Sequence, residues 1–243
     1  MKKVLILLAV VTLLLSGCNP VQAPAATSSA TTAPAASTAE VDLQQPLSTD
    51  PAVRIGKLDN GLTYYIRANQ EPKQRAQLWL AINAGSVLED DDQKGLAHFL
   101  EHMLFNGTEE YPKQALVDYL ESLGIQFGPD LNAYTSFDET VYMLQTPTDL
   151  PELLPKGLDV LSQWAHAALI DPTEVDNERG VIVEEWRLRD QTAQGRIIEK
   201  LVPTLLAGSK YAERLPIGDM DIVKSASPDT LRRFYETWYR PDN

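Results

Sequence analysis

The sequence contains little cysteine and few basic residues. Cys18 is the only cysteine among 243 residues, so no disulfide can form within this chain. Lys and Arg number 21 against 34 Asp and Glu, and the formal net charge is −13. A nucleic-acid duplex and an anionic membrane surface both repel that charge, which argues against nucleic acid as a partner. No internal repeat or coiled-coil pattern is present.

The first part of the chain also lacks an apolar run that could cross a membrane. Val4–Leu15 has twelve residues, whereas a spanning helix needs about 20. The run follows the basic pair Lys2-Lys3 and leads into Leu15-Ser-Gly-Cys18. Residues 1–18 therefore resemble a bacterial lipoprotein signal peptide.

Cys18 is the residue that such a signal would lipidate, which would anchor the protein to a membrane without a spanning helix. Asn19 follows it, and by resemblance to other lipoproteins this favours the periplasmic face of the outer membrane. The alternative is a plain secretory leader with an incidental cysteine.

Composition divides the remaining chain into a tether and a folded domain. Residues 19–50 are mostly Ala, Pro, Thr and Ser, which cannot bury enough apolar surface to offset the entropy of ordering, so we predict a disordered tether. Residues 51–243 carry enough apolar residues to form the core of one domain of ordinary size.

Periodicity and turn residues predict the elements of this domain. We expect the acidic run 89–92 to start a helix that Gly107 ends. The predicted strands are 53–58 and 62–67 as a hairpin, 76–83 in a central position, and 130–137 with 139–145 as an antiparallel pair. The further predicted helices are 112–124, 150–169, 172–189 with a continuation towards 206, and 228–238.

The stretch His98-Phe-Leu-Glu-His102 concentrates the chemistry. A helix turns about 100° per residue, so side chains 98, 101 and 102 share one face within about a turn. Two imidazoles one turn apart, with a carboxylate that can reach a water, are what a zinc ion takes from a single helix. The order His-x-x-Glu-His is the inverzincin signature. An ordinary amphipathic helix is the alternative, but the pattern is rare in a chain with three histidines.

A catalytic zinc needs a third protein ligand, which must come from elsewhere. The segment 174–186 offers Glu178, Glu184 and Glu185. Positions 178 and 185 are seven apart and share a helix face, whereas 184 points away from 178, and spacing alone does not rank the pair. A solvated acidic face is the alternative. We interpret His166, the third histidine, as a packed or surface residue.

Four motifs together resemble the pitrilysin (insulysin) family of zinc metallopeptidases, which includes the mitochondrial processing peptidase. The match covers about residues 52–243, and its motifs are His98-Phe-Leu-Glu-His102, Asn106-Gly-Thr108, Asn132-Ala-Tyr-Thr135 and Glu178-Arg-Gly-Val-Ile-Val-Glu-Glu185. The resemblance implies that His98, His102 and Glu185 bind zinc, that Glu101 is the catalytic base and that Glu178 supports the site from behind. Glu184 remains the alternative to Glu185.

The resemblance also implies the fold and the partners. We expect an α+β architecture with helices on one face of a mostly antiparallel sheet, incomplete at its C-terminal end, and a second homologous domain or subunit that completes a chamber. Peptide substrate would add as a strand beside Asn132, Ala133 and Tyr134. The predicted function is zinc-dependent endopeptidase activity on extended peptides, weak or absent in this chain alone. The alternatives are a non-catalytic lipoprotein that binds peptides or proteins through the same strand, and a zinc hydrolase of another small molecule.

Overall fold

A three-stranded antiparallel sheet forms the base of the site in the computed structural model, which describes residues 48–113, 115–189 and 192–243. The strand order is β3-β5-β4, built from β3 (Arg75–Ile82), β4 (Leu131–Thr135) and β5 (Thr140–Pro147). The sequence predicted a central position for residues 76–83, and this is wrong, because β5 is the central strand. β5 is buried along most of its length, whereas β3 alternates, with its Trp79 side chain 63% exposed.

A separate hairpin precedes this sheet. β1 (Val53–Lys57) pairs antiparallel with β2 (Thr63–Arg67), as the turn at residues 59–61 predicted. Gly61 has φ +100°, a conformation that glycine adopts without steric cost. The predicted signal peptide, the lipidation site Cys18 and all but the last residues of the tether lie outside the described residues.

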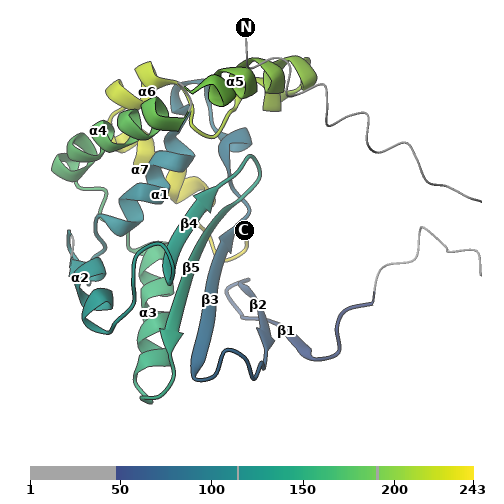
Figure 1. The fold of residues 1–243 in the computed structure, drawn as a ribbon, viewed down its shortest axis with the longest axis vertical. Coiled ribbons are helices and arrows are strands. Elements are labelled where there is room, and N and C mark those ends of the chain that lie inside the picture. The colour runs from purple at the N-terminus through teal and green to yellow at the C-terminus, as the bar shows by residue number, and fades with distance from the viewer. Residues whose placement is uncertain (1–47, 114, 190–191) are drawn as a thin grey trace, which may run out of the picture. The chain divides into compact units, whose positions relative to one another are not determined.

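Helices pack against one face of the sheet, around Tyr142 of β5 (Figure 1). The Tyr142 ring centroid lies 5.4 Å from that of Trp164 in α3 (Leu153–His166) and 6.1 Å from that of Phe105 in α1 (Leu96–Phe105). Its hydroxyl group lies 2.7 Å from that of Tyr239, directly after α7 (Pro228–Trp238). The α+β architecture predicted from the family resemblance is confirmed.

The other elements surround this core. They are α2 (Ala115–Ser122), α4 (Pro172–Arg189), α5 (Ala193–Leu205), α6 (Met220–Ser225) and the short 3-10 turns η1 (Ser86–Leu88), η2 (Asp91–Gln93) and η3 (Lys210–Glu213). The predicted continuation of α4 towards residue 206 is instead a second helix. Its start is capped by Thr192, whose hydroxyl accepts a hydrogen bond from Gly195 N at 3.0 Å.

The start of α1 differs from the prediction. The acidic run 89–92 lies outside the helix, which begins at Leu96 after Gly95, a residue with φ +97° that forces the chain to turn. The end agrees with the prediction to within two residues, since α1 stops at Phe105 just before Gly107.

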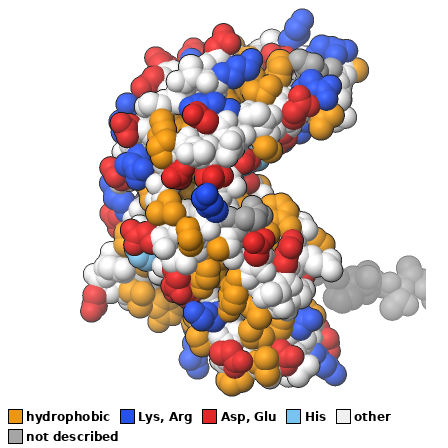
Figure 2. Space-filling view, turned by 90° about the vertical axis from the view of Figure 1, so that its left-hand side faces the viewer, with side chains coloured by type: hydrophobic (Ala, Val, Ile, Leu, Met, Phe, Trp, Pro, Cys, Tyr) orange, Lys and Arg blue, Asp and Glu red, His pale blue; other side chains and the backbone are white. Residues whose placement is uncertain are grey.

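The surface mixes charged and apolar side chains. On the face drawn in Figure 2, acidic and basic side chains are interspersed and hydrophobic ones are exposed among them. Within the described ranges, no helix combines the length and the apolar character that a bilayer crossing requires.

Candidate metal centre

Burial fixes helix α1 in the protein. Its core-facing side chains are Leu96, Phe99, Leu100, Met103 and Leu104, each at most 1% exposed. Such a stripe locks the rotation of the helix about its own axis, because any turn would expose apolar surface. His98, Glu101 and His102 occupy the opposite side, as the helical spacing predicted.

Three donor atoms meet beside this side of α1. His98 Nε2 lies 3.2 Å from His102 Nε2, and Glu185 Oε2 of α4 lies 3.5 Å from the first and 3.4 Å from the second. Ligand atoms about 2.0–2.2 Å from a tetrahedral zinc are about 3.3–3.5 Å from each other. The two imidazoles and this carboxylate therefore fit one zinc ion.

Glu178 orients one of the two histidines. Its Oε1 lies 2.8 Å from His102 Nδ1, and its Oε2 accepts a hydrogen bond from Asn106 Nδ2 at 2.6 Å. When His102 Nδ1 carries the proton and donates it to Glu178, Nε2 is left with a lone pair towards the centre. Glu178 therefore contacts the face of His102 that is turned away from the three donor atoms.

Electrostatics favour a positive charge at the centre. Burial alone would lower the pKa of His102, but hydrogen bonds to Glu178 and Glu185 outweigh it and raise the value to about 9. Burial, together with the neighbouring His102, lowers the pKa of His98 to about 4. The carboxylates of Glu178 and Glu185 beside the two histidines therefore favour a positive charge at this place, which a divalent cation would supply.

Glu101 faces the same centre without being one of the three donors. Its Oε2 accepts a hydrogen bond from Thr135 Oγ1 at 2.6 Å, at the end of β4. Burial raises the pKa of the Glu101 carboxyl, and the Thr135 bond opposes that rise. A raised pKa makes this carboxylate a stronger base than an exposed one.

A small cavity of about 160 Å³ joins these groups to the edge strand. It is lined by His98, Glu101, Ala133, Tyr134, Thr135, Glu185, Arg189, Pro216 and Ile217. Of the predicted substrate-binding residues, Ala133 and Tyr134 thus reach the cavity, and β4 is an edge strand of the sheet. Asn132 lies on the same strand, and its side-chain oxygen accepts a hydrogen bond from Ala133 N at 2.9 Å. A larger hollow along α5 contains no His, Asp or Glu and lies on that helix alone.

Glu184 and His166 lie outside the group of three donor atoms. Glu184 pairs with Arg187 at 2.8 Å, is more than half exposed and points away from the histidines. His166 is exposed at the end of α3, outside the donor cluster. The sequence motifs contain Asn106 and Thr135 but did not predict the contacts of either residue. No sequence pattern indicated a role for Arg189, whose Nη1 donates to Glu185 Oε1 at 3.3 Å.

Known proteins are similar to this chain in sequence and in fold. Residues 64–215 match the family model described as Insulinase (Peptidase family M16). The probable zinc protease PqqL of Haemophilus influenzae is 46% identical over 204 residues, which are 84% of this chain and 22% of that protein. The probable zinc protease PqqL of Escherichia coli is 46% identical over 197 residues, which are 81% of this chain and 21% of that protein.

A solved structure agrees. The crystal structure of the first half of the periplasmic protease PqqL from Escherichia coli matches with a TM-score of 0.78 at 46% identity, over 81% of this chain and 42% of that one. The chain spans about a fifth of the length of the two curated relatives. Because the matched family segment covers more than half of the chain and contains the His-x-x-Glu-His helix together with Glu178 and Glu185 of α4, the chain belongs to the insulinase family, peptidase family M16.

Proposed function

We propose that this chain carries the catalytic centre of a zinc-dependent endopeptidase. The observation that carries the proposal is the triangle of donor atoms from His98, His102 and Glu185, with sides of 3.2–3.5 Å, beside a carboxylate that is not a ligand. That carboxylate, Glu101, shares a cavity with an exposed strand edge. Relatives with 46% identity are named probable zinc proteases, which supports zinc as the metal.

In this proposal Glu101, Thr135 and Glu178 have separate roles. Bound zinc would supply Lewis acidity, which polarises a carbonyl group and acidifies water. Glu101 takes a proton from the attacking water and delivers it to the leaving amine, so that one carboxylate serves both proton transfers. Thr135 holds the Glu101 carboxylate towards the cavity, and Glu178 holds the orientation of His102.

Substrate would bind as an additional strand. Among the described residues β4 pairs with β5 on one side only, so its outer backbone groups would be available to an extended peptide. Asn132, Ala133 and Tyr134 would form this edge beside the cavity. Main-chain recognition predicts broad tolerance of side chains, and strict dependence of cleavage on one substrate side chain would count against it.

Substitution of the base tests the mechanism. The Glu101→Gln protein should keep its zinc, measured by elemental analysis, and lose peptide hydrolysis by about 100-fold or more, because the amide cannot accept the proton. Glu121→Gln, an exposed carboxylate on α2, is the matched control and should keep parental activity. Cleavage by Glu101→Gln at the parental rate would refute the assignment. These measurements use the natural full-length protein, and a full-length parent that binds zinc tightly but cleaves no peptide would favour the peptide-binding alternative.

Further parts of the proposal concern the rest of the protein. The folded catalytic domain comprises residues 51–243, and a second homologous domain or subunit completes the substrate chamber, so that the 243 residues alone hydrolyse peptides weakly or not at all. The solved relative that matches is described as the first half of its protein, which supports this division. Robust turnover by the 243-residue chain alone would contradict it.

We also propose that the protein is held at the cell envelope through Cys18. Residues 1–18 would be the signal and 19–50 the tether, and a relative described as a periplasmic protease supports this compartment. Metabolic labelling with a fatty acid should mark the parent, and Cys18→Ser should abolish both the label and the membrane association. Equal labelling of Cys18→Ser would refute the anchor.

A further inference from the structure

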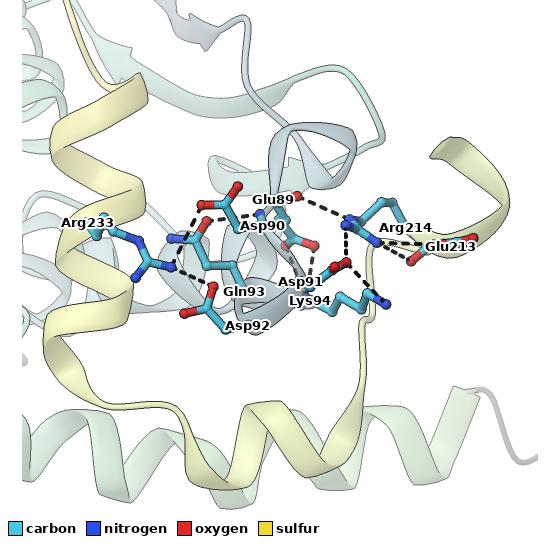
Figure 3. A network of polar contacts seen from close by, with 10 residues as sticks. Glu89, Asp90, Asp91, Asp92, Gln93, Lys94, Glu213, Arg214 and Arg233 are labelled. Carbon is cyan, nitrogen blue, oxygen red and sulfur yellow. Dashed lines mark hydrogen bonds and ion pairs between the residues drawn. The ribbon is translucent and has the colours of Figure 1, made fainter. Parts of the chain in front are cut away.

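Glu89 is a buried acidic residue that the proposed mechanism does not use. It lies outside helix α1 but is fully buried, and its carboxyl group points at the helix start (Figure 3). Gly95 N donates to both carboxyl oxygens, at 3.1 and 3.0 Å, and Ala97 N donates to Oε1 at 2.8 Å. The N-cap Gly95 has no side chain that could satisfy these N–H groups, so Glu89 replaces the usual cap.

The same residue is joined to a second segment by Arg214. Arg214 Nε donates to the backbone oxygen of Glu89 at 3.2 Å, and its Nη2 contacts Asp91 at 2.7 Å. The Arg214 side chain is only 5% exposed, although it carries a charge. Burial of a guanidinium group is costly unless its hydrogen bonds are made, so this junction holds its geometry tightly.

Two further contacts connect the junction to the walls of the cavity. Ser86 Oγ donates to the Arg214 backbone oxygen at 2.6 Å, and Ser86 N donates to the oxygen of Ser136, directly after β4, at 3.1 Å. On the other side of Arg214 the chain continues through Pro216 and Ile217, which line the cavity.

Residues 214–219 pack against the start of α1. Asp219 N donates to Lys94 O at 3.2 Å. A Cβ atom built on Gly218 would lie 2.1 Å from Gly95 Cα, so the two backbones are in contact where neither residue has a side chain. Three walls of the cavity, namely α1, the end of β4 and residues 214–219, therefore meet around Glu89.

We propose that Glu89 is a positioning residue, which sets where α1 begins relative to β4 and to residues 214–219 and thereby aligns Glu101 and His98 with the substrate edge. This inference rests on the proposed function for its consequence in catalysis. His98 is the third residue of α1 and the rise of a helix is about 1.5 Å per residue, so a shift at the helix start reaches the donor atoms undiminished. A displacement of about 1 Å costs catalysis about 100-fold.

The test is Glu89→Gln in the natural full-length protein, with Asp91→Asn as the matched control. Both variants remove one acidic charge near Arg214, but the Asp91 side chain is 86% exposed and forms ion pairs with Lys94 and Arg214 rather than with a residue of α1. An asparagine oxygen at position 91 can still accept the hydrogen bond from Arg214 Nη2. We expect Glu89→Gln to retain zinc and KM within about threefold and to lose kcat by about 10- to 100-fold, while Asp91→Asn stays within about twofold in both.

Cobalt substitution gives a readout that does not need activity. The visible spectrum of the Co²⁺-loaded protein reports the geometry of the ligands and should change in Glu89→Gln but not in Asp91→Asn. If the parent binds cobalt and cleaves no peptide, the proposed function fails, and the spectrum alone then decides on Glu89.

An unchanged spectrum and an unchanged kcat in Glu89→Gln would overturn the inference. So would a loss of kcat that follows the loss of folded protein and disappears at lower temperature. Should Glu89→Gln fail to fold, Ser86→Ala removes only the hydroxyl bond to Arg214 and should lower kcat by a few-fold with the same spectral change. A parental kcat and spectrum for Ser86→Ala would then refute the inference.

Discussion

Helices α1 and α4 both contribute groups to the proposed metal centre, but the protein holds them in different ways. Eight of the ten residues of α1 are buried, whereas only Val175 and Ile182 are buried among the eighteen of α4. The proposed centre therefore combines α1, which is packed in the hydrophobic core, with α4, most of whose side chains are not buried. We infer that a bound metal stabilises α4 far more than α1.

The starts of the two helices show the same contrast. Burial raises the pKa of Glu89, at the start of α1, to about 8, although the N–H groups of Ala97 and Gly95 oppose this. The N–H groups of Glu174 and Thr173 lower the pKa of the exposed Asp171, at the start of α4. A raised folded-state pKa makes the Glu89 contribution to stability decline as the pH rises towards 8. A lowered one makes the Asp171 contribution decline below about pH 4.

Metal removal should produce the largest difference between the helices. A ligand present at about 1,000 times its Kd stabilises the folded state by about 4 kcal/mol, so a chelator should lower the melting temperature clearly. Hydrogen exchange should then accelerate in α4 and remain slow in α1, because only α4 depends on the metal for its position. Equal acceleration in both helices would contradict the comparison.

Arg179 is expected to be the main protein contact that holds α4 when no metal is bound. Its two terminal nitrogens donate to the backbone oxygens of Val223 and Ala226, each at 2.6 Å, and its guanidinium lies 5.7 Å from the centre of the Phe99 ring. Arg179→Met should lower the free energy of unfolding by about 2 kcal/mol, because two charged hydrogen bonds are lost. Urea titration of the metal-free protein measures this.

The exposed Arg187, also on α4, provides the control for Arg179. Within the part of the chain that the structure describes, it pairs with Glu184 in the same helix alone, so Arg187→Met should change stability by less than about 0.5 kcal/mol. Equal effects of the two substitutions would mean that α4 is not held through Arg179.

Glu178 tests whether the orientation of a ligand matters as much as its presence. Glu178→Gln removes the charge that His102 Nδ1 faces at 2.8 Å, and zinc affinity should fall by about 10- to 100-fold. Titration against a chelator of known affinity measures the change. Glu184→Gln, on the same helix but directed away, should leave affinity unchanged, and a similar loss in both variants would point to net charge as the cause.

Asp171→Asn should have the smallest effect. The asparagine can still accept the hydrogen bonds from Thr173 N and Glu174 N, so stability at pH 7 should change little. Below about pH 4 the parent should lose stability through protonation of Asp171, and the variant should lose less. Unfolding curves between pH 3 and 7 decide this, and parallel curves would remove Asp171 from the comparison.

Patterns within short stretches of sequence predicted most of the helices and strands, and they placed three of the candidate site residues on one helix face. The hairpin turn at 59–61, the β4–β5 pair and the Ser227-Pro228 start of α7 are encoded within a few residues, and the structure has all three. The spacing of His98, Glu101 and His102 also placed them on one helix face. In each case the information lies in neighbouring positions.

The errors concern contacts between distant segments. The edge position of β3 depends on which strand lies between its neighbours, and periodicity within residues 76–83 carries no such information. Spacing within α4 also left Glu184 and Glu185 open, because which of the two lies beside the histidines depends on how α4 packs against α1. The acidic run 89–92 suggested a helix start by proximity in sequence, whereas Glu89 contacts that start across a turn formed by Gly95.

The contact between Gly95 and Gly218 limits which amino acids these two positions can hold. Each residue has a positive φ and each lies where an added methyl group would overlap the other backbone. At this place, where residues 214–219 meet α1, neither residue can gain a side chain without displacing the other backbone segment. Variation in the shape of the cavity would then fall to other lining positions such as 134 and 216, whose side chains border the cavity.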